Sequence, residues 1–317
     1  MIEDSFLVKL FNNDRRSVAR AISIAEVGDS TSSELLKKIF HKIGNAYRIG
    51  ITGPPGAGKS TITNQLTKLY VTRNKKVGII AVDPTSPFTG GALLGDRVRM
   101  NEIGQIPGVF IRSMATRGSL GGLSKKAVDA ADVLDAAGFD IIIFETVGVG
   151  QSELDIVEAA DTTIVVLVPE SGDSVQAMKA GLMEIADFFV LNKCDRPASQ
   201  QAVTALKTIL MMKAHDENSW MPNIIKTVAT ENKGIREVAD EIEIHKEYLI
   251  KQKKFLTKRE DQAKKRIQDI VEEKIHKELW EDIENNSLNS ALEKVILGKL
   301  SPYHIAEEII DNYKNQK

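Results

Sequence analysis

The feature that most constrains this chain is a glycine-rich segment at residues 53–60, with the sequence GPPGAGKS. It follows a short apolar run at residues 48–52 and precedes a stretch in which Ile62, Leu66 and Leu69 recur at helical spacing. A GxxxxGK[ST] segment between a strand and a helix is the signature of a phosphate-binding loop. The pattern therefore predicts an α/β nucleotide-binding fold; the alternative is a glycine-rich turn with a chance lysine.

Each residue type in this loop has a physical reason. Gly53, Gly56 and Gly58 allow backbone conformations that bring N–H groups close to phosphate oxygens, and the following helix N-terminus attracts negative charge. Lys59 is expected to reach the β- and γ-phosphates, and the Ser60 hydroxyl to ligate Mg²⁺. The candidate nucleotide-binding residues of the loop are Gly53, Pro54, Pro55, Gly56, Ala57, Gly58, Lys59, Ser60 and Thr61.

A second motif, Asn-Lys-Cys-Asp at residues 192–195, indicates which base is bound. The Asp195 carboxylate can accept hydrogen bonds from N1–H and the exocyclic amine of guanine, whereas adenine offers no such pair of donors. We expect Asn192 to bridge the loops around the base and the Lys193 stem to cover the ring. The motif follows a buried-strand pattern at residues 187–191. Together the two motifs predict GTP binding; the alternative for the second is a surface turn.

Composition limits the other classes of function. The chain has 317 residues, 42% of them apolar, which is enough for about two domains with a substantial core. Its net charge of −2 gives no general basic field for nucleic acid. The one cysteine, Cys194, fits a reducing compartment, and no apolar run approaches a membrane span. We expect a cytoplasmic protein that binds neither nucleic acid nor membrane and has no signal peptide.

The apolar patterning predicts three regions. Residues 1–44 form an N-terminal helical extension, residues 45–245 a P-loop GTPase domain, and residues 246–317 a C-terminal helical region. In the middle region, continuous apolar runs alternate with helical segments, which is typical of a mainly parallel central sheet buried on both faces and flanked by helices. The expected strands after the phosphate loop are residues 77–82, 109–114, 141–144, 163–168, 188–191 and 223–228.

Three acidic residues are candidates for the metal and switch regions. Asp83 ends an expected strand, where a carboxylate points into the ligand crevice of an open α/β sheet. Asp96 follows a glycine-containing segment, and either joins the Mg²⁺ shell or stabilises a helix N-terminus. Glu145 to Gly148 occupies the place where most GTPases carry DxxG, with Gly148 expected to bind the γ-phosphate.

The residues near the expected reaction centre predict slow hydrolysis. Val149 follows Gly148, where Ras-like enzymes carry the glutamine that orients water. Neither Arg112 nor Arg117 has a sequence position that marks it as an arginine finger. We therefore expect an intrinsic rate on the order of 10⁻⁴ to 10⁻² s⁻¹, increased by a partner. The candidate catalytic residues are Lys59, Asp83, Asp96, Glu145 and Gly148, and the candidate metal ligands are Ser60, Asp83, Asp96 and Glu145.

Several long segments together resemble the MeaB/ArgK family, the methylmalonyl-CoA mutase-associated GTPases. The resemblance covers roughly the whole chain. Two of its segments, GGALLGDRVRM at 90–100 and ETVGVGQSE at 145–153, are far more specific than the phosphate loop. The segments are GPPGAGKST at 53–61, VDPTSPFTGGALLGDRVRM at 82–100, RSMATRGSLGGLS at 112–124, ETVGVGQSE at 145–153 and NKCD at 192–195.

This resemblance implies a SIMIBI-class P-loop GTPase that forms a homodimer with help from its C-terminal helices. It also implies a chaperone that uses GTP to gate adenosylcobalamin loading into a B12-dependent acyl-CoA mutase, and that protects or reactivates this mutase. Asp83, Asp96 and Glu145 become metal- or switch-associated residues. Where the family often has Ser-Ala, this chain has Val228-Ala229-Thr230, expected to contact guanine through a backbone N–H.

Other functions remain alternatives. A nickel-insertion type of metallochaperone GTPase is disfavoured because the histidines are scattered and the cysteine lies in the base motif. A phosphotransferase acting on a transport protein, or an interaction protein whose nucleotide never turns over, are further alternatives. The resemblance does not distinguish methylmalonyl-CoA mutase from isobutyryl-CoA mutase or another B12-dependent relative. The chain has no DxHxxG-type cobalamin motif, so we expect the cofactor to reside on the partner.

Overall fold

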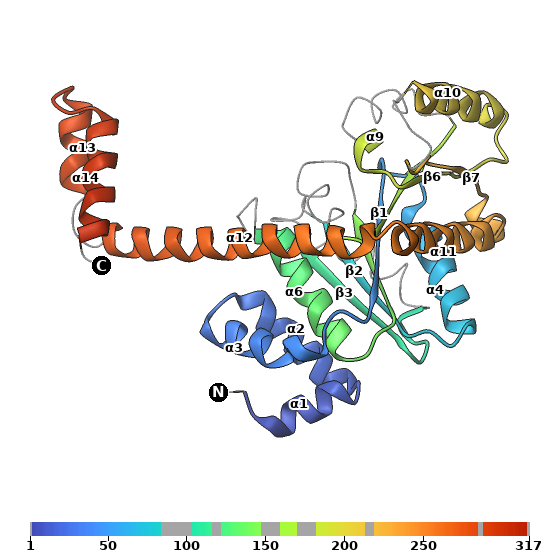
Figure 1. Ribbon diagram of the computed structural model, residues 1–317, viewed down its shortest axis with the longest axis horizontal. Coiled ribbons are helices and arrows are strands. Elements are labelled where there is room, and N and C mark those ends of the chain that lie inside the picture. Colours follow the sequence, from blue (N-terminus) through green and yellow to red (C-terminus); the bar gives the residue numbers. More distant parts are fainter. Residues whose placement is uncertain are drawn as a thin grey trace. The chain divides into compact units, whose positions relative to one another are not determined.

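The computed structural model describes residues 2–83, 103–115, 122–146, 159–169, 182–212, 219–284 and 288–315. The chain divides into two compact units, residues 1–258 and 259–317 (Figure 1). The first unit contains the whole sheet, and the second contains the greater part of the C-terminal helices.

The centre of the first unit is a seven-stranded sheet in the order β3-β2-β4-β1-β5-β6-β7. Every paired neighbour runs parallel, so all strands end at the same edge. The sheet confirms the predicted fold class. The strands are β1 (Tyr47–Thr52), β2 (Val77–Asp83), β3 (Val109–Ala115), β4 (Ile141–Thr146), β5 (Thr162–Leu167), β6 (Phe188–Leu191) and β7 (Ile224–Lys226).

The central strands β4 and β5 are buried at every position and largely apolar, because both faces of the sheet are covered. In β4, Ile142 and Phe144 face one hydrophobic core, whereas Ile141 and Ile143 face the other. The first core is closed by α6 (Gly122–Ala136) and the N-terminal helices, and the second by α4 (Lys59–Thr72) and α11 (Ile235–Lys251). A third core lies between β5 and β6 and the helices α9 (Leu182–Ile185) and α10 (Ser199–Met211).

The N-terminal helices share a core with the sheet. Leu10, Val18 and Ile22 are fully buried and belong to the same apolar cluster as Phe144 of β4. Aspartates cap two of these helices: Asp14 accepts the N–H of Ser17, and Asp29 forms a capping box with Ser32. The elements are α1 (Asp4–Phe11), α2 (Arg15–Val27), α3 (Ser30–Ile39) and the short 3₁₀ helix η1 (Phe40–Lys42).

One carboxylate ties this helical region to the first strand. Asp135 of α6 accepts hydrogen bonds from the backbone N–H groups of Gly44, Asn45 and Ala46 at 2.8, 3.1 and 3.0 Å. The Arg48 guanidinium lies 2.6 Å from Asp132, one turn earlier on the same helix. These bonds fix the path of the chain immediately before β1 and therefore the direction in which β1 enters the sheet.

The C-terminal helices carry an apolar stripe. Ile267, Val271 and Ile275 recur every four residues on α12 (Lys254–Glu284) and are 63%, 49% and 46% exposed. The 3₁₀ helix η2 (Ala229–Glu231) precedes α11, and the last two helices are α13 (Leu288–Ile296) and α14 (Pro302–Asn315). Within the described ranges, no helix combines the length and hydropathy that spanning a bilayer requires.

Candidate nucleotide-binding site

The glycine-rich loop joins the end of β1 to the start of α4. Gly53, Gly56 and Gly58 all have positive φ, at 140°, 75° and 95°. A side chain at Gly53 would overlap the carbonyl oxygen of Val166 on β5, and one at Gly58 would overlap the Asn192 amide. All three glycines therefore suit the backbone conformation, and Gly53 and Gly58 are also required by the close approach of β5 and of Asn192.

The Lys59 side chain is turned back into this loop. Its ammonium group donates hydrogen bonds to the carbonyl oxygens of Gly53 and Pro54 at 2.7 and 3.0 Å, and the residue is only 6% exposed. A phosphate group would offer charged acceptors in place of these neutral carbonyls, so the ammonium would gain an ion pair in addition to its hydrogen bonds. The geometry therefore holds the lysine where an anionic ligand can recruit it.

Ser60 and Glu145 meet at the start of α4. The Ser60 hydroxyl donates a hydrogen bond to Oε1 of Glu145, which lies on β4 and is 5% exposed. A hydroxyl and a carboxylate side by side form an oxygen donor set of the kind that Mg²⁺ prefers, so the residues present fit this ion. In the described part of the chain, no group of three or more His, Cys, Asp or Glu side chains is placed to hold a metal ion.

Of the other predicted metal and switch residues, the structure describes the backbone position of Asp83 only. Asp83 is the last residue of β2, and its neighbour Val82 is in register with Thr146, directly after Glu145. The sheet therefore brings the backbone of Asp83 to the same edge as Glu145. Asp96 and Gly148 lie outside the described residues, as do Arg117 and Val149.

Asn192 connects the base motif to the phosphate loop. Its amide nitrogen donates to the carbonyl oxygen of Ala57 at 2.9 Å, while its amide oxygen accepts from the Thr227 hydroxyl at 3.0 Å and the Ala229 N–H at 3.1 Å. Asn192 is 3% exposed. One side chain thus joins the loops that follow β1, β6 and β7.

The neighbours of Asn192 extend this connection. Lys193 has a left-handed backbone, with φ of 59°, and its ammonium donates to the carbonyl oxygen of Gly56 at 2.8 Å. Asp195, two residues on, is exposed and accessible to a ligand. Burial raises the pKa of the intervening Cys194 thiol, which keeps this residue uncharged beside the base motif.

Sequence reasoning missed Thr227 as part of this site. Its hydroxyl orients the Asn192 amide, and its backbone N–H donates to the Leu191 carbonyl at 2.9 Å. The predicted segment Val228-Ala229-Thr230 begins one residue later. The signal that could have found Thr227 is its polar hydroxyl at the end of an apolar run that reaches the same sheet edge as the base motif.

Arg112, considered as a candidate near the reaction centre, is engaged elsewhere. It lies on the edge strand β3, and its guanidinium forms two hydrogen bonds with the Glu26 carboxylate of α2, the Nε to Oε1 bond measuring 2.7 Å. Both side chains are about one quarter exposed. The ion pair connects α2 to β3, and it engages the Arg112 guanidinium with Glu26.

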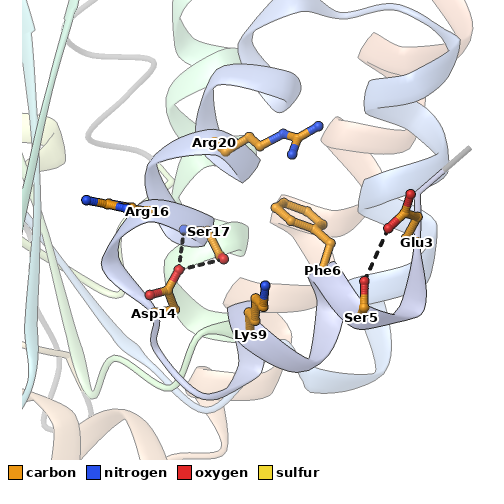
Figure 2. A pocket seen from close by; sticks show the side chains of 8 residues that line it. All are labelled: Glu3, Ser5, Phe6, Lys9, Asp14, Arg16, Ser17 and Arg20. Carbon is orange, nitrogen blue, oxygen red and sulfur yellow. Dashed lines mark hydrogen bonds between the residues drawn. The ribbon is translucent and has the colours of Figure 1, made fainter.

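A cavity of about 290 Å³ lies between α1 and α2, and none of its lining residues belongs to the nucleotide motifs (Figure 2). The Arg20 guanidinium lies 5.4 Å from the Phe6 ring, and Asp14 is held by Ser17 as a helix cap. The walls carry charges of both signs, and the hydroxyl of the buried Ser17 donates a hydrogen bond to Asp14 at 2.7 Å. The lining residues are Glu3, Ser5, Phe6, Lys9, Asp14, Arg16, Ser17 and Arg20.

Comparison with known proteins agrees with these motifs. Residues 18–284 match the model of the family described as methylmalonyl-CoA mutase-associated GTPase MeaB. A putative GTPase of Pyrococcus horikoshii is 47% identical over 97% of this chain and 97% of its own length. The GTPase ArgK of Escherichia coli is 38% identical over 73% of this chain and 72% of its own.

A solved structure extends the likeness to three dimensions. The crystal structure of an LAO/AO transport system kinase is 28% identical to this chain, with a TM-score of 0.74. The match covers 99% of each chain. The similarity therefore includes the N-terminal and C-terminal helical segments as well as the sheet.

Gly58 allows a direct test of the Asn192 connection. Gly58→Ala and Gly56→Ala both place a side chain at positive φ, at a cost of roughly 1–2 kcal/mol, but only the methyl at 58 would meet Asn192. We expect Gly58→Ala to weaken GTP binding at least tenfold more than Gly56→Ala, measured with a fluorescent guanine nucleotide. Equal losses in the two variants would show that the Asn192 contact does not support binding.

Proposed function

Because this chain belongs to the family of methylmalonyl-CoA mutase-associated GTPases, we propose that it is a GTP-hydrolysing chaperone of a B12-dependent acyl-CoA mutase. In this role it gates adenosylcobalamin loading into the mutase and protects or reactivates that enzyme. It acts in the cytoplasm, and the cobalamin resides on the partner. The observation that carries the nucleotide part of the proposal is the Asn192 side chain, which joins the base motif to the phosphate loop.

The nucleotide site works through preorganised polar groups. The backbone N–H groups of the loop at residues 53–61, other than the two prolines, and the Lys59 ammonium stabilise the charge on the phosphates while water attacks the γ-phosphorus in line. Asn192, Lys193 and Asp195 hold and read guanine, and a backbone N–H within residues 228–230 completes the base contact. Ser60 and Glu145, with Asp83 and Asp96, hold Mg²⁺, which when bound neutralises charge on the phosphate oxygens.

The proposal includes slow hydrolysis that the partner increases. The Arg112 guanidinium pairs with Glu26 and so does not serve as an arginine finger in this arrangement. In related hydrolases an arginine finger increases the rate of GTP hydrolysis by roughly 10³- to 10⁵-fold. The engagement of Arg112 with Glu26 suits a gate whose GTP persists until the mutase binds.

Asp195→Asn tests the base assignment. An amide can no longer accept both guanine hydrogen bonds, and loss of a charged bond of about 1.5–3 kcal/mol corresponds to roughly 10- to 100-fold weaker GTP binding. The same amide can donate to the carbonyl oxygen that xanthine carries instead of an amine. We expect xanthosine triphosphate to bind the variant better than GTP in a competition assay; retained guanine preference would contradict the assignment.

Phosphate release tests the function itself. We expect slow release from GTP and none from ATP with the purified protein alone, and a several-fold increase when the acyl-CoA mutase of the same organism is added. Lys59→Ala serves as the control that removes turnover. GTP turnover without any effect of the mutase would overturn the chaperone proposal, and transfer of the phosphate to an acceptor protein would favour a phosphotransferase.

The C-terminal helices supply the surface for a homodimer. Ile267, Val271 and Ile275 form an exposed apolar stripe on a helix that is otherwise rich in charged residues. An amphipathic helix of this kind is stabilised when its apolar stripe is covered. We propose that the stripe of a second copy of this chain covers it.

Val271→Glu tests this interface, because it places a charge on the apolar stripe. We expect the wild-type protein to sediment as a dimer at micromolar concentration and the variant as a monomer with unchanged GTP affinity. Glu272→Gln changes an exposed neighbour and is the matched control. A monomeric wild-type protein would rule out the proposed dimer.

A further inference from the structure

A continuous chain of polar side chains, three of them buried and the fourth, Asp187, 21% exposed, crosses the amino edge of the sheet, opposite the edge that carries the nucleotide motifs. The Tyr47 hydroxyl lies 2.6 Å from the Thr162 hydroxyl, which lies 2.8 Å from Nδ1 of His245. Nε2 of His245 lies 3.3 Å from the Asp187 carboxylate. Tyr47 and Thr162 are the first residues of β1 and β5, and His245 belongs to α11.

When His245 is neutral, each contact of this hydrogen-bonded chain can be assigned one donor and one acceptor. The Asp187 carboxylate, 3.3 Å from Nε2, favours the tautomer that carries its hydrogen on Nε2, so Nδ1 accepts the hydrogen of the Thr162 hydroxyl, whose oxygen in turn accepts from Tyr47. The other carboxylate oxygen of Asp187 accepts the backbone N–H of Thr163 at 2.7 Å. His245 is 1% exposed, so its imidazole has no direct access to water in this arrangement.

The surroundings keep His245 neutral near pH 7. Burial lowers the pKa of its imidazole, and this effect outweighs the nearby Asp187 carboxylate, which acts in the opposite sense. Lys258 lowers the pKa further, and Asp161 raises it. Several other titratable and charged groups face these four hydrogen-bonded side chains or belong to them. They are Tyr47, Asp161, Asp187, Glu243, Lys246, Tyr248 and Lys258.

The junction between α11 and α12 packs against Tyr47, Asp161 and Asp187. Lys258 on α12 donates to the Asp161 carbonyl oxygen at 2.9 Å and lies 3.6 Å from the Asp187 carboxylate. The Phe255 ring stacks on Tyr47 with centroids 6.2 Å apart. Lys258 is also the last residue of the first unit.

Trp220 closes this cluster from the other side. Its ring centroid lies 4.8 Å from that of His245, and its indole N–H donates to the carbonyl oxygen of Asp187. The imidazole is therefore enclosed by the sheet, by Trp220 and by its own helix. A change in its hydrogen bonding therefore acts on α11, which carries His245, and on the start of α12, where Lys258 lies beside Asp187.

We propose that the Tyr47–Thr162–His245–Asp187 chain is a proton-operated latch that holds the α11–α12 junction against the amino edge of the sheet. When His245 binds a proton from solvent, Nδ1–H must point at the Thr162 oxygen. Only one of the two hydroxyl hydrogens of Tyr47 and Thr162 can then lie between their oxygens, so the other loses its acceptor within this chain, and a positive charge is buried. Both costs favour opening of the junction, where the imidazolium reaches water.

The sign of the pH effect follows from linkage. The latched imidazole titrates below the released one, whose pKa is about 6.5, so the open form binds more protons. Latching is complete above about pH 6.5 and weakens as the pH falls below that value. At pH 5.5 a released imidazole is about tenfold more often protonated than neutral, so opening increases by up to about 10-fold.

Hydrogen exchange of the full chain tests this latch. We expect protection factors of residues 242–258, corrected for intrinsic exchange, to fall by up to about 10-fold between pH 7.5 and 5.5, while those of α4 stay constant. Thr162→Val keeps the side-chain shape and removes the hydroxyl, so the junction should exchange faster at both pH values. Unchanged GTP affinity at pH 7.5 shows that this variant is folded.

His245→Gln separates the latch from ordinary acid destabilisation. A glutamine amide does not titrate, so the pH dependence at the junction should disappear, whereas His276→Gln, at an exposed position of α12, should keep it. The proposal is overturned if the wild-type junction is equally protected at both pH values. It is also overturned if α4 loses protection in parallel, or if His245→Gln retains the pH dependence.

Discussion

The Asn192 amide is the interaction on which the arrangement of the nucleotide motifs depends. It donates to the phosphate loop and accepts from two groups of the loop after β7, so it uses both halves of one amide. No apolar or purely acidic side chain of that size can do both. The base motif and the phosphate loop therefore cannot shift independently, and Gly58 must lack a side chain because the amide passes so close to it.

Much of the fold could be predicted because the sheet is buried on both faces. Strands in that environment are continuous apolar runs, and β6 spans the four residues that the sequence pattern indicates. The prediction was too long at the last strand, where residues 223–228 were expected and β7 covers Ile224–Lys226. Thr227 directly follows the end of β7, and its hydroxyl donates to Asn192.

The contacts that complete the candidate site could not be predicted in the same way. The motifs identify Ser60 and Glu145 as candidates, but they do not show that the hydroxyl donates directly to the carboxylate across 85 positions of sequence. The ion pair between Glu26 and Arg112 likewise joins two elements that have no local pattern in common. Such pairs depend on tertiary placement, which amphipathic periodicity and motif spacing do not encode.

The shared core between the N-terminal helices and the sheet has a consequence for modularity. A conventional nucleotide-binding module would be cut at β1, immediately before the phosphate loop. In this protein that cut would uncover the face of β4 that carries Phe144 and remove the three N–H groups that satisfy Asp135. The smallest transplantable unit therefore begins with α1, and the motif-bearing segment is an interior part of it.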